Sequence, residues 1–594
     1  MSSEGPTSAT GAVLARPDVS TLRTKQGAWI GVGGSSFTVT GRSAFQVVST
    51  LLDRADGSRS GRALVDEFPA GARPVVARVL DALVARRCVA VLDAPLPEHV
   101  AAKGPAAQWL VPYLAQLTDE PVRALDRVLA TTLRLYGRPD WLDRLRRLLE
   151  AAPLSGLRTE FRAIPATGPG EGPEQPGEDA GLVVLDADGL PYEHVVRLQD
   201  DLLARGVPHG IAGEAAGRRW ILWSDDAATG CWECLCRYGR TTTPAVPTAA
   251  APAVSPAHDT TVADDALAAA LVQAVHLRAA GLAGPSAAAV SLSLAAPQPT
   301  VTAHPVWSEA GCRCHRARSR RAVTGQVPVA ERDKAAEVLV RRNIVGPEDD
   351  SRLDGVHERI VDTLRGWTDE FAGPFRHLDG GDLTQVPFGR AKVTALVGLA
   401  DACRVHEHVT ATLSPREAIY QAALNAVEGF ASPTAGAGWA LDEAVYRALL
   451  KSSLAQPPEH SSWVRLTDDD LGHGECASFA RYIKRAVDRE SDSGRESGRE
   501  AVRWTGTRLP NGIHRVTGRT GGGPVLRGAG VCYAEAVAMA LLGLVNDDGA
   551  LVPLNPHFLT WPEVWRHVAR PAFAEVTERT APFAHGKVRL VEIA

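Results

Sequence analysis

The stretch LVVLDA at residues 182–187 decides how the middle of the chain folds. Four apolar residues in succession, closed by an aspartate, are typical of a strand that is buried on both faces of a parallel sheet. A helical pattern follows at residues 195–205, and two more apolar runs follow at 207–211 and 219–223. Because strands that alternate with helices form parallel sheets, the sequence predicts an α/β domain here.

A strand and a helix upstream of this stretch, at residues 131–137 and 141–149, predict another α/β unit. A nucleotide-binding version of such a unit needs a glycine-rich turn between strand and helix, so that backbone N–H groups can approach phosphates. The turn in this chain reads GRPD at residues 137–140. Since proline donates no N–H, this turn is a poor phosphate cradle, and no cofactor is predicted there.

Three segments in succession resemble the second half of the ThiF-like, E1-like adenylating fold. They are LVVLDA, LLARGVPHGI at residues 202–211, and TGCWECL at residues 229–235. The resemblance is greatest to the ocin-ThiF-like proteins of pathways that make thiazole- and oxazole-containing peptides. It implies an E1-like domain that has lost its nucleotide site, and a precursor peptide as partner.

A C-x-x-C pair can supply two corners of a tetrahedral zinc site, and in the family that the chain resembles a second cysteine pair stands downstream. The cysteines that two such pairs would provide are Cys231, Cys234, Cys312 and Cys314. The second pair has C-x-C spacing, which strains the geometry and leaves Cys236 and His315 open as substitutes. Four protein ligands leave no position for a catalytic water, so this zinc would be structural. The alternative is a set of reduced, partly buried thiols.

Residues 26–93 begin with two strand-like runs at 28–32 and 36–40, and the Gly33-Gly34 pair between them is typical of a hairpin turn. Three helices and a strand are predicted to follow, at residues 43–52, 62–67, 73–86 and 88–92. With LLDRADGSRSGRALVDEF between the first two helices and VVARVLDALVARRCV as the third, this order resembles the winged-helix recognition domain (RRE) of enzymes that modify ribosomal peptides.

In that family the leader peptide adds a strand to the hairpin edge and packs beside the third helix, which is strand augmentation. By this resemblance the residues that would grip the peptide are Phe37, Val39, Val76 and Leu80. Some of these four must be ordinary core residues. A winged helix without this role, or one that binds DNA, is the alternative interpretation.

The carboxy-terminal half contains a helical segment at residues 414–430, with Ser414 as its N-cap and a proline at its first position. The segment resembles the helix of YcaO proteins, which activate a backbone amide with ATP and whose glutamates hold magnesium ions. The first glutamate of that pattern falls on Asn425 and the arginine falls on Gly429, so only Glu428 remains.

A second segment, at residues 528–546, resembles another YcaO helix, but its glutamate falls on Gly543 and its glutamine on Asn546. Because glycine offers no ligand oxygen, the resemblance implies a degenerate site without intact ATP binding. An unrelated α/β domain is the alternative.

A rival catalytic motif lies at residues 473–480, HGECASFA, where Cys476 stands at the start of a predicted helix. A helix N-terminus lowers a thiol pKa, and His473 and His514 are candidate bases, as in cysteine hydrolases. No Asp or Asn partner can be placed, which weakens this interpretation.

A net charge of -5 and a pI near 6.4 argue against nucleic-acid binding, which needs surplus basic residues. The N-terminus lacks a secretory signal, and there is no apolar run of the roughly 18 residues that a membrane span needs, so a cytoplasmic location is expected. Linkers are expected at residues 167–179, 241–261 and 489–500, which are rich in Pro, Gly, Ser and charge.

The sequence therefore predicts an α/β multidomain chain: a winged-helix domain at residues 22–95, an E1/ThiF-like domain with a zinc site at 96–320, and an α/β domain at 321–594. The function that these resemblances imply is recruitment of a precursor peptide to a separate YcaO cyclodehydratase, which forms azolines. A homodimer is left open. The competing hypotheses are a catalytic cyclodehydratase, a cysteine hydrolase that uses Cys476, and a DNA-binding regulator.

Overall fold

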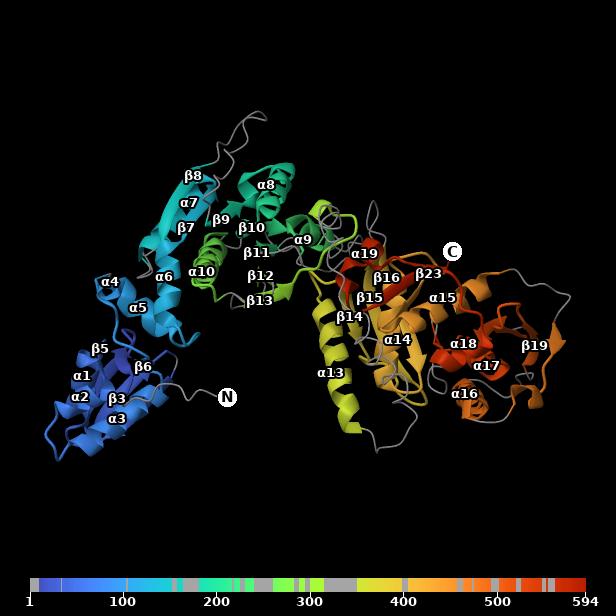
Figure 1. The fold of residues 1–594 in the computed structure, drawn as a ribbon, viewed down its shortest axis with the longest axis horizontal. Helices are drawn as coiled ribbons and strands as arrows, with labels where there is room; N and C mark the ends of the chain where they lie inside the picture. The colour runs from blue at the N-terminus through green and yellow to red at the C-terminus, as the bar shows by residue number, and fades with distance from the viewer. Residues whose placement is uncertain are drawn as a thin grey trace. The chain divides into compact units, whose positions relative to one another are not determined.

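The computed structural model of the chain is a mixed α/β structure with several sheets (Figure 1). The structure describes residues 10–33, 35–102, 105–151, 157–163, 181–215, 218–224, 230–239, 260–282, 288–293, 300–314, 350–397, 404–456, 463–472, 475–492, 502–519, 525–546, 552–553 and 561–593. Within these ranges, no helix combines the length and the apolar character that crossing a bilayer requires. The expected linker at 167–179 lies outside them, as does nearly all of the one at 241–261.

The chain forms two compact units. The amino-terminal unit contains the described residues within Met1–Glu214, Arg218–Asp225 and Val254–Thr302. The carboxy-terminal unit contains those within Ala215–Gly217, Asp226–Ala253 and Ala303–Ala594. The prediction of three domains stays a prediction.

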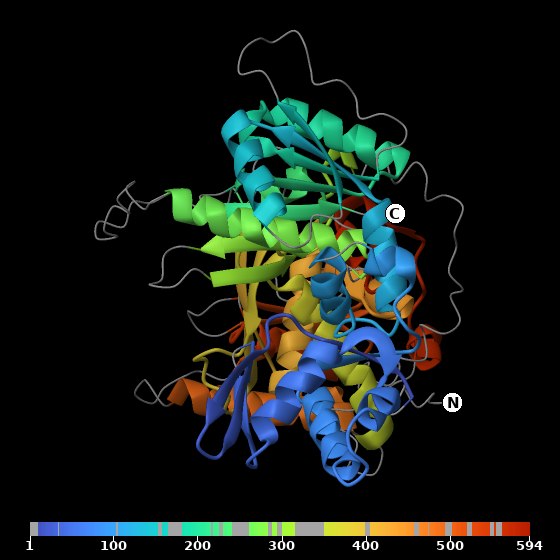
Figure 2. The same cartoon turned by 90° about the vertical axis from the view of Figure 1, so that its left-hand side faces the viewer.

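The first part of the amino-terminal unit has two small sheets and three helices (Figure 2, blue). One sheet has the order β2-β3-β4 and the other β5-β1-β6. The elements are β1 (Ala12–Ala15), β2 (Ser20–Thr24), β3 (Gly27–Val32), β4 (Ser35–Thr40), α1 (Ala44–Arg54), β5 (Asp56–Ser60), α2 (Gly61–Asp66), α3 (Arg73–Ala85) and β6 (Val89–Leu92). The predicted hairpin, helices and closing strand are therefore present, and β1, β2 and β5 are additional to them. Gly34, in the predicted turn, lies outside the described residues.

A seven-stranded sheet forms the rest of this unit, in the order β13-β12-β11-β10-β9-β7-β8. Its strands are β7 (Thr132–Gly137), β8 (Arg158–Ala163), β9 (Leu182–Asp186), β10 (His209–Ala215), β11 (Arg218–Ser224), β12 (Ala288–Ser293) and β13 (Thr300–Pro305). The neighbouring strands β8, β7, β9 and β10 are parallel to one another. All five residues of β9 are buried, as the apolar run predicted.

Helices cover both faces of this sheet. The helices of this part of the unit are α4 (Glu98–Ala101), α5 (Pro105–Leu114), α6 (Pro121–Ala130), α7 (Pro139–Ala151), α8 (Tyr192–Arg205) and α10 (Thr260–Ala279). Side chains of α6, α7 and α10 share one core with Ala212 of β10. Gln199 of α8 instead contacts His209, whose side chain points to the opposite face of β10 because side chains alternate along a strand.

The carboxy-terminal unit contains three sheets, with the orders β14-β15-β16, β17-β23-β22 and β18-β19-β20-β21. Its strands are β14 (Phe375–Asp379), β15 (Gly389–Val397), β16 (Arg404–Thr412), β17 (Gly436–Gly438), β18 (Val464–Arg465), β19 (Arg503–Arg508), β20 (His514–Arg519), β21 (Leu526–Gly530), β22 (Phe573–Glu575) and β23 (Arg589–Ile593). Its helices are α9 (Trp232–Gly239), α13 (Asp350–Trp367), α14 (Pro415–Glu428), α15 (Leu441–Ala455), α16 (Glu475–Asp492), α17 (Tyr533–Leu542), α18 (Trp561–His567) and α19 (Thr577–Thr580).

Three predictions for this unit can be compared directly with its helices. The N-cap prediction is confirmed, because the Ser414 side chain accepts a hydrogen bond from the N–H of Glu417 and a proline opens α14. The helix expected over 528–546 is shorter than predicted, since residues up to Gly530 belong to β21 and α17 begins at Tyr533. The linker expected at 489–500 begins inside α16, which extends to Asp492.

Candidate functional site

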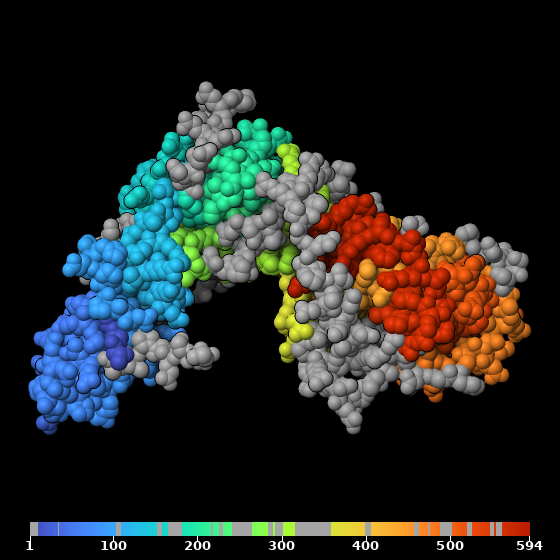
Figure 3. All heavy atoms as spheres, viewed as in Figure 1, coloured from blue at the N-terminus to red at the C-terminus, as the bar shows by residue number. Residues whose placement is uncertain are grey.

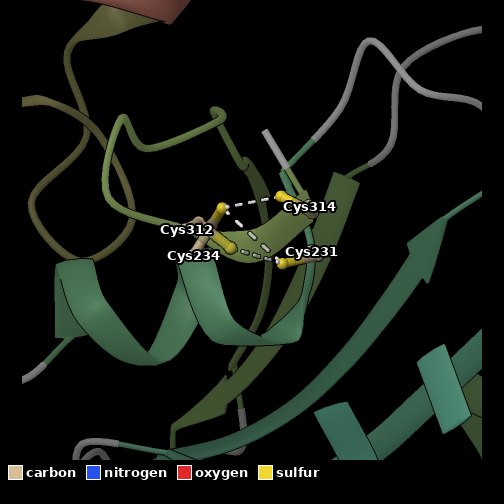
Figure 4. Close-up of side chains that lie close together, drawn as sticks. All are labelled: Cys231, Cys234, Cys312 and Cys314. Carbon is tan, nitrogen blue, oxygen red and sulfur yellow. Dashed lines mark hydrogen bonds between the residues drawn. The ribbon is translucent and has the colours of Figure 1, made fainter. Parts of the chain in front are cut away.

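Four buried cysteine sulfurs meet in the carboxy-terminal unit (Figure 4). Cys231 lies just before α9 and Cys234 lies in its first turn, whereas Cys312 and Cys314 come from the segment after β13. All four sulfur atoms lie within 4.8 Å of one another. Cys236, which the sequence left open as a substitute, is half-buried and is not part of this group, and His315 lies outside the described residues.

The spacing of the sulfur atoms suits a tetrahedral metal ion. Zinc–sulfur bonds of about 2.3 Å in a regular tetrahedron place neighbouring sulfurs about 3.8 Å apart. The sulfur of Cys231 lies 3.7 Å from that of Cys234 and 3.3 Å from that of Cys312, and the sulfurs of Cys234 and Cys314 are 3.6 Å apart. The C-x-C spacing of the second pair therefore does not keep its sulfurs from the group.

The backbone around this cysteine cluster holds the two segments together. The N–H of Gly230 donates to the carbonyl of Val306, and a Cβ at Gly230 would lie 2.6 Å from the Trp307 carbonyl oxygen. Only glycine permits this close approach, which brings the start of α9 beside the segment that carries Cys312. The geometry is thus set by packing as well as by the thiols.

The thiols of the cluster influence one another's ionisation. Burial raises the pKa of Cys231 well above its ordinary value of 9.0, and hydrogen bonds with the other thiols add to the rise. Burial also disfavours the Cys234 thiolate, but hydrogen bonds from the three neighbouring thiols lower its pKa well below 9.0. A metal ion bound by these thiols would displace their protons, because metal ligation requires the thiolate form.

Two carboxylates and an arginine surround the cysteine cluster. The Cys312 thiol donates to Glu233 Oε2 at 3.2 Å. Arg237 lies 2.7 Å from Glu233 and 3.1 Å from Glu309, whose side chain is fully buried. One arginine faces two carboxylates, so this surrounding adds no net positive charge to the cluster.

A second site of interest lies in the amino-terminal unit, at the carboxyl ends of β7 and β9. In an open parallel sheet, ligands bind where the strand order reverses, and β7 occupies that position between β8 and β9. Here Asp186 Oδ2 accepts the backbone N–H of Arg138 at 3.1 Å and its Nε–H at 2.8 Å. A Cβ at Gly137 would lie 2.6 Å from Trp141 and 2.7 Å from Asp186. The Asp186 carboxylate thus accepts the N–H that a bound phosphate would otherwise accept. The side chains of Trp141 and Asp186 occupy the space beside Gly137 through which a phosphate would approach.

The four residues predicted to grip a peptide divide into two pairs. Phe37 and Val39 are half-buried on β4, and the Arg86 guanidinium lies 5.1 Å from the centre of the Phe37 ring. Val76 and Leu80 are only 1% and 2% exposed, because they point from α3 into the core of this part of the unit. Among the described strands β4 pairs with β3 alone, so its other edge is open.

The YcaO-like positions of α14 take part in a buried ion-pair network, which we call the Glu428 cluster. It consists of Gln421, Asn425 and Glu428 of α14 with Arg447 and Lys451 of α15. Arg447 and the N–H of Ala437 both donate to Glu428 Oε1, and Lys451 Nζ lies 2.6 Å from Glu428 Oε2. Arg447 also donates to Asn425 Oδ1 at 2.7 Å and to Gln421.

Sequence reasoning missed the two cations of this cluster. Arg447 lies beside Oε1 of Glu428 and Lys451 lies beside Oε2, so cationic side chains of the protein stand at both oxygens. The remaining YcaO-like positions have structural roles: Gly429 and Gly543 are the C-caps of α14 and α17, and Asn546 accepts the N–H of Ala411.

The structure places the Cys476 thiol beside a second thiol, that of Cys532. Its sulfur lies 3.9 Å from that of Cys532, and hydrogen bonding to Cys532 together with burial raises the pKa of Cys476. The hydrogen bond from Cys476 lowers the pKa of Cys532, the N-cap of α17, although burial opposes this. The His514 ring packs edge-on against Tyr533, with 4.4 Å between ring centres, and His473 lies outside the described residues.

Comparison with solved structures identifies the fold. A heterocyclase in complex with substrate and cofactor aligns with 98% of this chain and 94% of its own length, with a TM-score of 0.53 and 11% sequence identity. The chain therefore has a heterocyclase-like fold. At that identity the likeness concerns architecture alone.

Two weaker likenesses carry no argument of their own. The heterocyclase TruD aligns over 98% of this chain and 94% of its own, at a TM-score of 0.45 and 12% identity. The microcin C7 biosynthetic enzyme MccB, in complex with N-formylated MccA, aligns over 49% of this chain and 96% of its own, at a TM-score of 0.32 and 12% identity. No protein-family model and no curated protein matches the sequence.

Proposed function

We propose that this protein binds the leader of a ribosomal precursor peptide and presents that peptide to a separate YcaO cyclodehydratase, which forms the azolines. The protein itself would carry out no ATP chemistry. The observation that carries the proposal is the combination of a heterocyclase-like fold with two closed sites at the positions where nucleotide chemistry would be expected.

The first closed site supports a non-catalytic amino-terminal unit. A nucleotide at the carboxyl ends of β7 and β9 would need the backbone N–H groups at the start of α7. The Arg138 N–H is already bound by Asp186, and burial raises the pKa of this carboxyl while the hydrogen bonds from Arg138 oppose the rise. A phosphate would have to displace this internal anion and would then meet its negative charge.

The second closed site, the Glu428 cluster, supports the same conclusion for the carboxy-terminal unit. Magnesium–phosphate binding needs carboxylates whose charge is free to neutralise the ion. Glu428 is 2% exposed and lies against Arg447 and Lys451, which neutralise it already. A cation that entered here would be repelled by both of these side chains.

The open edge of β4 supports peptide binding. An extended peptide can pair with an unpaired strand edge through main-chain hydrogen bonds, while side-chain pockets supply specificity. Phe37 and Val39 alternate with exposed residues along β4, so they are placed to contact an added strand. Val76 and Leu80 would support that contact from beneath, because they lie in the core.

The cysteine cluster would hold a structural zinc ion in this picture. The ligands would be Cys231, Cys234, Cys312 and Cys314. Zinc would neutralise the negative charge of the buried thiolates, and it would join the start of α9 to the segment after β13. Four protein ligands would give it no open position for chemistry.

The proposal is tested with the purified protein and a candidate precursor peptide, to be sought among short reading frames beside its gene. The labelled leader of that peptide should bind with a Kd of about 1 μM or lower, and the protein alone should hydrolyse no ATP. The substitution Val39→Asp should weaken binding about tenfold or more, because a charge would face the apolar side of the added strand.

A matched control is Leu22→Asp, which lies on β2 at the opposite edge of the same sheet and is 60% exposed. This variant should bind the leader like the parent protein. Equal loss in both variants would argue against the β4 edge. ATP turnover by the protein alone would instead favour the second candidate, a catalytic cyclodehydratase, which the heterocyclase-like fold keeps in view.

A further inference from the structure

The four-stranded sheet β18-β19-β20-β21 has one face that packs inward. Directly opposed residues of antiparallel strands point to the same side of a sheet. Trp504, Gly518 and Leu526 oppose one another across β19, β20 and β21, and Leu526 belongs to the core that α17 completes. A Cβ at Gly528 would lie 1.9 Å from the Ala536 carbonyl oxygen of α17, so this face is in close contact with that helix.

The opposite face of this sheet carries arginine on every strand. Two rows of directly opposed residues form it: Arg465, Thr505, Thr517 and Arg527 in one row, and Arg503 with Arg519 in the next. The four arginines in these two rows are all exposed. We call Arg465, Arg503, Arg519 and Arg527 the arginine face; its strands β18 to β20 lie in the orange surface of Figure 3.

This arrangement is unfavourable for the isolated protein. Like charges directly opposite each other on neighbouring strands destabilise a sheet, and Arg503 is directly opposite Arg519. Arg515 lies on the same face, in the row next to the one that contains Arg527. Burial, together with the nearby charge of Arg527, lowers the pKa of Arg515. Positive charge is thus concentrated here in a chain whose net charge is -5.

No carboxylate among the described residues forms an ion pair with the arginine face. Among the described residues, the acidic residues nearest in sequence are Asp468, Asp469 and Asp470, which follow β18. They turn toward the other side of the sheet: Asp468 lies 3.8 Å from Lys484 of α16, and Asp470 accepts hydrogen bonds from Thr467. Within the part of the chain that the structure describes, these arginines therefore have no carboxylate as an ion-pair partner.

We propose that the arginine face binds a carboxylate-rich segment of another polypeptide, a role independent of leader binding at β4. Each guanidinium can bind a carboxylate through two parallel hydrogen bonds, and strands about 4.8 Å apart present these groups at a spacing that an extended acidic peptide can match. Thr505 and Thr517 lie between Arg465 and Arg527 in the same row, and the Thr505 hydroxyl donates to the Thr517 carbonyl at 3.3 Å.

Charge favours an acidic peptide over a nucleic acid as the occupant. Nucleic-acid binding draws its affinity from a broad basic surface that neutralises many phosphates. The arginine face has four exposed cations on an acidic chain, so a long polyanion that bound there would meet repulsion beyond the patch.

The test uses the full chain and a fluorescein-labelled peptide of ten glutamates, with binding followed by fluorescence anisotropy at about 50 and about 300 mM salt. The parent protein should bind the peptide, more weakly at the higher salt. The double variant Arg503→Gln with Arg519→Gln should bind about tenfold more weakly or worse. The control Arg508→Gln removes an exposed arginine of β19 that points to the other face, opposite His514, and should bind within about twofold of the parent.

Two outcomes would overturn the proposal: equal loss in Arg508→Gln and in the double variant, or tighter binding of a ten-nucleotide oligothymidylate than of the glutamate peptide. Absence of glutamate-peptide binding to the parent protein at about 50 mM salt would also overturn it. If the double variant does not fold, Arg527→Gln alone serves as the test, with an expected loss of about threefold or more. Leader binding should be unchanged in all of these variants, so failure here is distinguishable from failure of the proposed function.

Discussion

The carboxy-terminal unit contains two buried clusters of acidic groups, and they differ in whether cationic side chains of the protein stand beside the acids. In the Glu428 cluster, one carboxylate lies beside Arg447 and Lys451, and its backbone neighbour Ala437 adds a hydrogen bond. In the cysteine cluster, four thiols gather beside Glu233, and the single arginine close by is shared with Glu309. The first cluster supplies its own cations and the second does not.

The difference shows why similar buried acids lead to different conclusions. A buried charge is costly unless it is paired, so each cluster must obtain positive charge from the protein or from an ion. The Glu428 cluster obtains it from α15 and has no place for a metal. The cysteine cluster has sulfur spacings that match a tetrahedral ion, and a divalent cation is the natural source of its positive charge.

The largest expected effect is that of removing a thiol from the cysteine cluster. The substitution Cys234→Ser should reduce bound zinc from about one ion per chain to near zero, because three thiolates no longer complete the tetrahedron. Zinc is measured by inductively coupled plasma mass spectrometry, together with the thermal unfolding midpoint. The control Cys236→Ser should keep the metal; equal zinc in Cys234→Ser and the parent protein would break the comparison.

The next effect concerns the cations of the Glu428 cluster. The substitution Arg447→Met should lower the free energy of unfolding by about 3–5 kcal/mol, because it leaves a buried carboxylate with Lys451 as its sole cationic partner. Adding Glu428→Leu should restore part of the lost free energy, because it removes the buried carboxylate. The recovery should be incomplete, because Gln421 and Asn425 still lack the hydrogen bonds that Arg447 donates. Denaturant titration of both variants measures this; no rescue by the double variant would contradict the account.

The pH dependence of stability offers a smaller effect. Burial acts to raise the pKa of Glu428, but Arg447 and Lys451 together lower it below the ordinary value of 4.5. The folded protein therefore holds this proton less tightly than the unfolded chain does. The resulting stability is present above pH 4.5 and is lost as the pH falls through the lowered folded pKa.

Glu428→Gln should accordingly flatten the loss of stability on acidification below pH 4.5, as measured by denaturant titration at several pH values. Glu443 is the matched control, because burial raises its pKa above 4.5. Glu443→Gln should remove a contribution of opposite sign, and a change of the same sign in both variants would count against the assignment.

The smallest effect concerns the arginine face, where charges of one sign lack partners but water screens them. Arg503→Glu would place a carboxylate directly opposite Arg519 and should raise the free energy of unfolding by about 0.2–1 kcal/mol. The same substitution should weaken binding of the glutamate peptide. A gain in stability together with a loss of binding would show that the sheet gives up stability for recognition; a loss of stability would contradict this.

Local patterns in the sequence predicted those parts of the fold that depend on local physics. The apolar run of β9, the Ser414 cap and the β3–β4 hairpin follow from periodicity and from capping or turn residues that lie close in sequence. The strands β1, β2 and β5 were missed. Strand β5 reads DGSRS and has no apolar alternation, so only its pairing with β1 makes it a strand.

The candidate sites were harder to predict, because they depend on pairs far apart in the sequence. Nothing in local spacing relates Arg138 to Asp186, which lies 48 residues away, or Glu428 to Arg447. The cysteine site is the exception, because two pairs of cysteines predicted Cys231, Cys234, Cys312 and Cys314 together, with Cys236 and His315 left open, and the structure groups those four sulfurs. For Val76 and Leu80, the resemblance to a peptide-binding family predicted contact with a leader peptide. In the structure, both side chains pack in the core.

The bond between Asp186 and the N–H of Arg138 has a further consequence for a presenting protein. If the protein presents a peptide as proposed, an internal carboxylate at this position would make it insensitive to adenine nucleotides there, because their phosphates would meet a negative charge. Assembly with a peptide and an enzyme partner would then depend on their concentrations alone, by mass action. Consumption of ATP would be left to the partner, and the protein would remain ready to bind whether nucleotide is scarce or plentiful.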